Sequence, residues 1–373
     1  MRATCLAGFA LIVLGGAGAF GQGAGSVGRL PRAEVVDLRQ LVDGLVGGVA
    51  GGDDVQIKWD GHFMRAGDGR VYVPFTVTLN DVAQGFDEVT MYVRVLPRGA
   101  RARSGRGAGL GLNTAESPAG TDQMASGNPT AEGASFRLGL TANELLRVKP
   151  SLEGFFVART QSTAAERLLR RSFTLAPGDY DLYVVIRERP GSGVSSRPQA
   201  AVLKRELSVP TLGGDEPTMS SVILADRVDF LAKPVPAMQE AERPYAFGVT
   251  EIVPDTDAVF DENALLSVVF FVYNLTVDKG HLPDVSVHYR FRRAGAGAEI
   301  FAELMPLRLA RGHTPPVFET RAGRQLAVTQ GLPLASFPPD NYTLEITVRD
   351  NLSARSVRRE IRFTVREATR GRR

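Results

Sequence analysis

The chain has few of the residues that perform covalent chemistry or bind transition metals. It contains one cysteine, Cys5, among 373 residues, and four histidines, at His62, His281, His288 and His313. Cys5 lies in an N-terminal apolar segment. A mature chain without that segment would have no disulfide, no catalytic thiol and no cysteine-ligated metal. No two histidines have metal-ligand spacing on one element, so the sequence predicts no histidine metal site and no cofactor.

Tryptophan is equally scarce, because Trp59 is the only one in the chain. Sandwich proteins that bind carbohydrate usually present exposed aromatic rings, and Trp59 could serve as such a platform. It could also be a core anchor near the end of a strand. The sequence leaves both interpretations of Trp59 open.

Neither sign of charge predominates in the chain, since the net charge is only +3. The arginines are scattered and interleaved with acids, without the aromatic residues of a nucleic-acid surface, so we expect no nucleic-acid partner. The motifs of a nucleophile elbow, a zinc protease and a phosphate-binding loop are absent from the sequence. Nothing in it therefore indicates an enzyme.

Two groups of acids resemble the oxygen-rich loops that calcium prefers. One group precedes a strand and consists of Asp255, Asp257, Asp261 and Glu262. The other lies near a turn and consists of Asp53, Asp54, Asp60 and Asp68. Neither has the spacing of an ordered calcium loop. Turn formation and solvation explain both groups, and calcium stays an open alternative.

The N-terminus has the features of a signal peptide. Arg2 precedes an apolar run over residues 3–14, and small residues follow it at positions compatible with cleavage. We expect residues 1–21 to be removed, with an uncleaved anchor as the alternative. The protein is then exported to the periplasm or the extracellular side of a bacterial envelope, without an integral membrane span after cleavage.

An internal repeat defines the expected architecture. Residues 70–79 (RVYVPFTVTL) and 89–95 (VTMYVRV) are rich in β-branched and aromatic residues and predict two strands. Residues 266–275 (LSVVFFVYNL) and 285–291 (VSVHYRF) match them at a constant separation of 196 positions. A constant separation over two strands and their connection indicates a duplication.

The repeat resumes near the end of each copy. Residues 175–186 (LAPGDYDLYVVI) match residues 337–348 (FPPDNYTLEITV) at a separation of 162 positions. In each copy a turn precedes a tyrosine just inside the strand, which predicts a tyrosine corner at Tyr180 and at Tyr342. The first copy is longer by 34 residues (196 − 162), and a flexible, glycine-rich insertion over about residues 98–133 accounts for the excess.

The turn, tyrosine and closing strand resemble the final hairpin of bacterial Ig-like and fibronectin-III-like modules, and the mature chain resembles exported bacterial proteins with two such modules. The resemblance implies a fold and no activity. Each unit is nearer 150 residues than the roughly 100 of a simple Ig domain. The predicted fold is mainly β, with two tandem Ig-like antiparallel β-sandwich domains and a short N-terminal amphipathic helix.

The remaining segments complete the domain plan. We expect an N-terminal segment at 22–54 with a helix at about 33–46, sandwiches at 55–209 and 218–366, a linker at 210–217 and a basic tail at 367–373. The expected function is non-catalytic: the protein binds a protein partner or an envelope surface through sandwich edges and loops. Carbohydrate binding is the alternative, and an enzyme of unrecognised type is a third hypothesis. The sequence does not indicate the oligomeric state.

Overall fold

The structure is a computed structural model that describes residues 30–47, 57–80, 87–98, 148–162, 166–189, 199–294, 299–310, 318–320 and 323–368. The predicted signal peptide, nearly all of the predicted insertion at 98–133 and most of the basic tail lie outside these residues. The described chain is mainly β, with antiparallel sheets and one longer helix near the N-terminus.

The first half begins with the helix and continues as nine strands among the described residues. They are α1 (Arg32–Val46), β1 (Ile57–Gly61), β2 (Met64–Arg65), β3 (Val71–Asn80), β4 (Glu88–Pro97), β5 (Leu152–Arg159), β6 (Gln161–Ser162), β7 (Glu166–Leu175), β8 (Gly178–Glu188) and β9 (Ala200–Val209).

The second half is built almost wholly of strands. They are β10 (Thr218–Met219), β11 (Ile223–Phe230), β12 (Ala246–Phe247), β13 (Thr250–Pro254), β14 (Val259–Asp261), β15 (Leu265–Tyr273), β16 (Val285–Arg293), β17 (Ile300–Glu303), β18 (Leu307–Leu309), β19 (Phe318–Thr320), β20 (Gly323–Pro333), β21 (Asp340–Asp350) and β22 (Ser356–Arg366). A four-residue helix α3 (Ala237–Glu240) and a 3₁₀ turn (Leu334–Ser336) interrupt them.

The strands form four sheets. Sheet A has the order β1-β3-β7-β6 with β2 paired to β3, and sheet B has the order β5-β4-β8-β9. Sheet C has the order β12-β13-β11-β15-β20-β19 with β10 paired to β15. Sheet D has the order β14-β22-β21-β16-β17 with β18 paired to β16. The pairs are antiparallel except that between β14 and β22, which is parallel.

The two halves repeat one strand order. β3 and β4 correspond to β15 and β16, and β8 corresponds to β21, as the two separations in the sequence predict. The central path β1-β3-β7-β6 of sheet A matches β11-β15-β20-β19 of sheet C, and β5-β4-β8-β9 matches β17-β16-β21-β22. The long connection between β4 and β5, against the short one between β16 and β17, places the extra residues of the first half.

Alternation of side chains explains how each pair of sheets forms a sandwich. Successive strand residues point to opposite faces of a sheet. In β16 the odd-numbered residues from Val285 to Phe291 are buried and the even-numbered ones are partly exposed. The buried side chains on the facing surfaces of sheets C and D form one core cluster, and those on the facing surfaces of sheets A and B belong to another.

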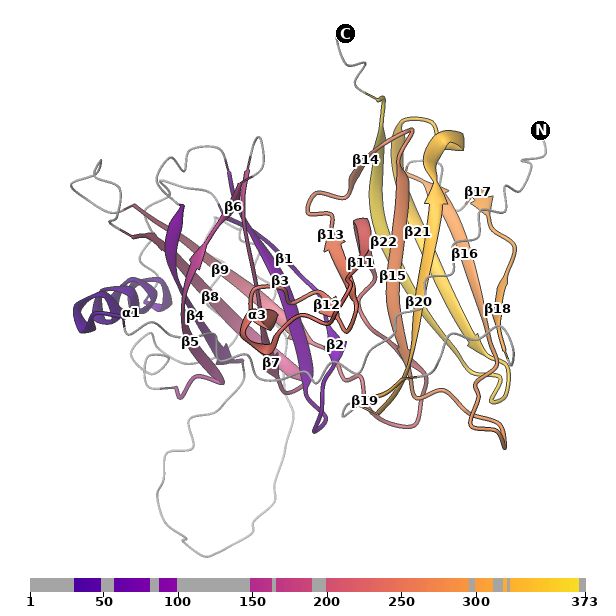
Figure 1. The fold of residues 1–373 in the computed structure, drawn as a ribbon, viewed down its shortest axis with the longest axis horizontal. Coiled ribbons are helices and arrows are strands. Elements are labelled where there is room, and N and C mark those ends of the chain that lie inside the picture. The colour runs from indigo at the N-terminus through magenta and orange to yellow at the C-terminus, as the bar shows by residue number, and fades with distance from the viewer. Residues whose placement is uncertain are drawn as a thin grey trace, which may run out of the picture.

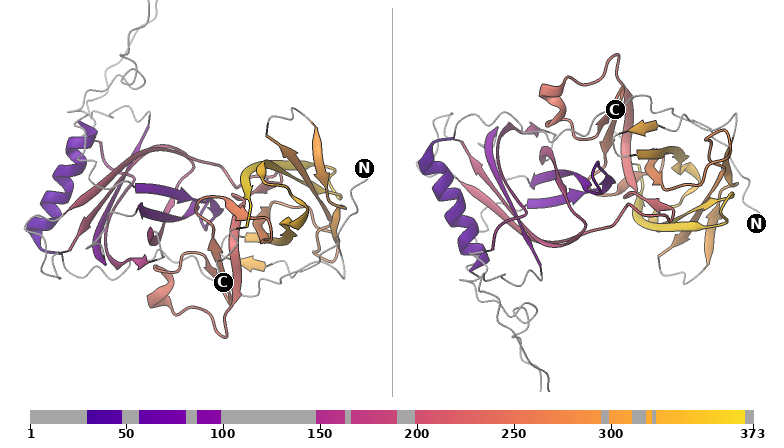
Figure 2. Two further views of the ribbon diagram at one scale, coloured as in Figure 1. Left: turned by 90° about the horizontal axis from the view of Figure 1, so that it is seen from above. Right: turned by 90° about the horizontal axis from the view of Figure 1, so that it is seen from below.

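Sheet A also packs on sheet C, so the sheets stack in the order B, A, C, D along the molecule (Figures 1 and 2). Strand β15 is buried on both faces: Phe270 faces sheet D, while Phe271 belongs to the core cluster that includes sheet A. The predicted linker at 210–217 contributes to the same cluster through Leu212, which is buried. The cores of the two sandwiches are therefore joined by a third layer of buried contacts.

Helix α1 packs on the outer face of sheet B, at the opposite end of the molecule from sheet D (Figure 2). Its buried residues Leu38, Val42 and Val46 recur every fourth position, as a helix that covers a sheet requires. Ion pairs hold its polar side, among them one of 2.5 Å between Asp43 and Arg94 of β4. The chain entering the first sandwich is fixed to it over four helical turns.

Candidate functional site

The two predicted tyrosine corners are structural elements of matching geometry. The hydroxyl of Tyr180 donates to the backbone oxygen of Ala176 at 2.9 Å, and that of Tyr342 donates to Pro338 at 2.6 Å. Each bond closes the turn before its strand, and both rings are buried. Both tyrosines therefore close the turns of the fold.

Trp59 lies in the core of the first sandwich, which corrects its interpretation as a ligand platform. Its side chain is only 5% exposed. Its ring stacks on Phe75 with 3.9 Å between centroids and lies 6.1 Å from Phe173. A buried ring that packs on other core rings has no free face for a sugar, because β1 turns this residue inward.

Aromatic side chains in general are kept from the surface. All eight tyrosines are at most 8% exposed. Among the aromatic residues whose side-chain burial is described, Phe230 is the only exposed one. The described surface therefore lacks the grouped aromatic rings that sandwich proteins use against carbohydrate.

In the two predicted calcium loops, the described acids form hydrogen bonds with backbone N–H groups and ion pairs with other side chains. Asp255 accepts backbone N–H groups from Asp257 and Ala258, and Asp261 forms an ion pair with Arg366 at 2.6 Å. No three His, Cys, Asp or Glu side chains of the described ranges gather in a metal-binding arrangement. Asp53 and Asp54 lie outside those ranges.

Asp255 is the described carboxyl group with the most perturbed acidity. Burial raises its pKa from 3.8 to about 7, and the neighbouring charges of Asp257 and Asp226 add to the effect. The folded state therefore holds this proton more tightly than the unfolded state does. The resulting stabilisation is complete below about pH 4 and is lost as the pH rises through about 7.

Asp255→Asn is expected to remove the loss of folding stability that accompanies ionisation of Asp255. Asparagine keeps the acceptor for the two backbone N–H groups and carries no charge at any pH. The variant should unfold at a temperature on the order of a few degrees higher than the parent at pH 8, with little difference at pH 4. Thermal unfolding between pH 4 and 8 measures this. Asp257→Asn is the control, because it keeps the carboxyl of Asp255 and removes one neighbouring negative charge. The loss of stability with rising pH should therefore persist, with its midpoint shifted to lower pH. Parallel profiles for the parent and Asp255→Asn would contradict the assignment.

The outer face of sheet D is the most strongly organised polar surface of the described chain. Its central strands β16, β21 and β22 turn their apolar side chains to the core and a set of charged side chains outward. The strand register places Arg290 opposite Glu345, and Glu345 opposite Glu360. Long side chains from neighbouring strands can therefore meet across this face.

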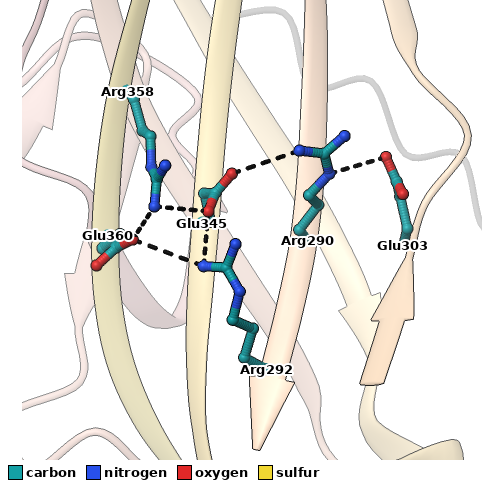
Figure 3. Close-up of polar contacts among 6 residues, drawn as sticks. All are labelled: Arg290, Arg292, Glu303, Glu345, Arg358 and Glu360. Carbon is teal, nitrogen blue, oxygen red and sulfur yellow. Dashed lines mark hydrogen bonds and ion pairs between the residues drawn. The ribbon is translucent and has the colours of Figure 1, made fainter. Parts of the chain in front are cut away.

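Glu345 is the centre of this arrangement (Figure 3). Its side chain is only 3% exposed although it points away from the hydrophobic core. Arg292 and Arg358 lie 2.7 and 2.8 Å from one carboxylate oxygen, and Arg290 lies 3.8 Å from the other. Three guanidinium groups therefore cover the carboxylate in place of apolar side chains.

Two further glutamates extend the array to neighbouring strands (Figure 3). Arg290 pairs with Glu303 of β17 at 3.1 Å. Arg358 donates to Glu360, and this hydrogen bond lowers the pKa of Glu360 below its usual range. We call these six residues the sheet D lattice: Arg290, Arg292, Glu303, Glu345, Arg358 and Glu360. Three positive and three negative charges give the lattice a net charge of zero.

Two arginines on the same face add an excess of positive charge. Arg349 of β21 and Arg362 of β22 are exposed and form no ion pair with a described residue. Arg362 lines an open groove of about 880 Å³ at one end of the face. Arg292, Arg293, Asn341 and Thr364 line it as well, and so do the acids Asp257 and Glu360. The face thus combines an ordered neutral centre with two free guanidinium groups and a concave end.

The charged face of sheet D could not be recognised from the sequence alone. Its only sequence signal is the alternation of arginine with apolar residues in residues 289–293 (YRFRR) and 357–363 (VRREIRF). Alternation of that kind equally fits a solvated strand face. The register between β16, β21 and β22 is needed to bring these residues together.

Comparison with known proteins adds no functional assignment. No family model matches the chain, and no curated protein matches it. No helix of the described ranges has both the length and the apolar character needed to cross a bilayer.

Proposed function

We propose that this chain is an exported, non-catalytic interaction protein that binds a protein partner through the outer face of sheet D. The sheet D lattice carries the proposal. Lysine and arginine side chains lose substantial rotamer freedom when they bind, and that loss opposes association. In the lattice the guanidinium groups are already held by Glu345, Glu360 and Glu303, so less freedom remains to be lost.

The charges of this face favour a partner of mixed, mainly acidic surface. Arg349 and Arg362 supply the excess positive charge that attracts such a surface. Glu303 and Glu360, whose side chains are 40% and 48% exposed, would repel a uniformly negative polymer. A protein surface can place both acids and bases opposite them, which gives specificity as well as attraction.

The stacked architecture supports the same function. The matching strand orders of the two halves support an origin by duplication of an Ig-like module, and the apolar N-terminus supports export. The joined sandwiches share buried contacts and present sheet D at one end and α1 at the other (Figure 2). A scaffold with an ordered polar face suits binding without chemistry.

A double charge reversal at Arg349→Glu and Arg362→Glu tests the proposal. A photo-crosslinking residue at Thr347, which lies along β21 between the positions of these two arginines, should capture a partner protein in the native envelope. The reversal should weaken that binding about tenfold or more, because like charges then oppose each other. Binding by the parent should also weaken as salt is raised.

Arg159→Glu is the matched control, since Arg159 is also exposed and lies on β5, in sheet B. It should leave the crosslink unchanged. Unchanged capture by the double variant, or capture only from a crosslinker placed on sheet B, would contradict the assignment of this face. Loss of binding on digestion of an anionic polysaccharide would identify that polymer as the partner instead.

A further inference from the structure

A second site lies between the two halves of the chain, remote from the sheet D lattice. A cavity of about 230 Å³ is lined by Gln161 and Arg170 of sheet A and by residues of sheet C and its loops. The residues from the second half that matter most are Arg227, Arg243, Tyr245 and Glu251. Clefts between packed units are a common place for small-ligand sites.

Arg170 reaches this cavity from the face of sheet A that is turned toward sheet C. It is paired in register with Thr76 of β3, which is fully buried. One terminal nitrogen of Arg170 donates to Gln161 at 3.0 Å. Its Nε atom is buried and has no hydrogen-bond partner among the described residues.

The other arginines around the cavity are neutralised by carboxylates. Arg243 pairs with Glu251, and Arg227 pairs with Asp229 at 2.9 Å. Arg171, which neighbours Arg170 along β7, lies 3.6 Å from Glu242. Arg170 forms no ion pair with a described residue. The carboxylates of Glu251 and Asp226 act on its charge only from beyond contact distance, so no acid contacts this guanidinium group.

Burial of that charge lowers the pKa of Arg170, although a guanidinium group stays protonated under all ordinary conditions. A desolvated cation without a counter-ion is unfavourable, and a bound anion would relieve it. A guanidinium edge matches two oxygens of a carboxylate or a similar oxyanion. The cavity thus offers the charge, the donors and the enclosure that such an anion needs.

Size and charge narrow the class of ligand. The volume is below the roughly 300–1,000 Å³ that is usual for drug-sized molecules, so the ligand is small. The carboxylates of Glu251 and Glu242 in the same wall would oppose a second negative charge. We propose that this cavity binds a small monovalent carboxylate, held by Arg170 and positioned by Gln161.

The test measures thermal unfolding and calorimetric binding of the purified protein with sodium acetate, at constant ionic strength against sodium chloride. Acetate should raise the unfolding temperature in a saturable manner, because it binds only the folded state. Sodium sulfate should do so more weakly. Arg170→Gln should weaken acetate binding about tenfold or more through loss of the charge-assisted contact. Arg159→Gln, a change at an exposed arginine of sheet B, should not alter it.

Arg170→Gln should fold normally, because the removed cation has no ion pair to lose. If it does not fold, Gln161→Ala gives a second variant, which should weaken acetate binding severalfold. The absence of saturable acetate binding, or equal binding by parent and Arg170→Gln, would overturn the site. Equal binding of sulfate and acetate would overturn the monovalent class of ligand.

Discussion

Replacement of Phe271 by alanine is expected to destabilise the protein by about 3–5 kcal/mol, the range for deletion of a buried phenylalanine side chain. Phe271 points away from the sheet C–sheet D core, yet it is only 3% exposed. Its ring packs edge-on to Phe247 at 5.5 Å and lies in the cluster that includes sheet A. In an isolated second sandwich Phe247 would still contact this ring, but the buried side chains of sheet A in the same cluster would be missing.

Chemical denaturation measures the loss, and Phe230→Ala is its control. Phe230 ends β11 of the same sheet but is 60% exposed, so its replacement should change the free energy of unfolding by less than about 0.5 kcal/mol. Phe270→Ala, on the other face of β15, should be as costly as Phe271→Ala. A small effect of Phe271→Ala beside a large one of Phe270→Ala would show that the sandwiches are independent.

Polar contacts make the same interface specific. Ser221 accepts a hydrogen bond from the backbone N–H of Phe63 at 2.9 Å, and Tyr72 donates to the backbone oxygen of Pro244 at 2.9 Å. His62 and Tyr245 are hydrogen-bonded at 2.8 Å within the buried layer. Apolar packing alone would permit the sheets to slide, whereas paired polar groups fix one arrangement.

The strands and their duplication could be predicted because both depend on local pattern. Alternating side chains determine which face of β4 or β16 is buried, and proline, glycine and aspartate determine the turn before Tyr180. The packing of sheet A on sheet C could not be predicted as firmly, because it depends on contacts between residues far apart in the sequence. A sequence signal exists, since residues 266–275 are almost continuously apolar, as in strands buried on both faces.

The sheet D lattice was beyond prediction for a different physical reason. Glu345 occupies a position of β21 that alternation assigns to solvent, and most glutamates in such positions are solvated. Its burial depends on Arg290, Arg292 and Arg358, which come from two other strands. No local pattern reveals a contact that exists only in one register of three strands. The sequence around Trp59 left a different question open. A single aromatic position in a short strand does not tell whether its side chain points to the core or to solvent.

Glu345→Gln is expected to cost about 2–3 kcal/mol of folding free energy. Removal of one partner from a buried ion pair typically costs about 3–5 kcal/mol, because the remaining charges lose their counter-ion. The value is lower here, since the three arginine side chains are 25–53% exposed and water still screens them. Glutamine has nearly the same volume, so the loss reports charge rather than packing.

Glu303→Gln is the matched control for this prediction. It makes the same chemical change on the same sheet, but Glu303 is 40% exposed and, among the described residues, forms an ion pair only with Arg290. Its replacement should cost less than about 1 kcal/mol, and high salt should reduce that cost further. The cost of Glu345→Gln, measured by denaturation at low and at high salt, should persist because its carboxylate is shielded from mobile ions. Equal and small free-energy costs for the two variants would show that the charge of Glu345 does not hold the arginine side chains in place. The sheet D lattice would then not be a pre-ordered binding face.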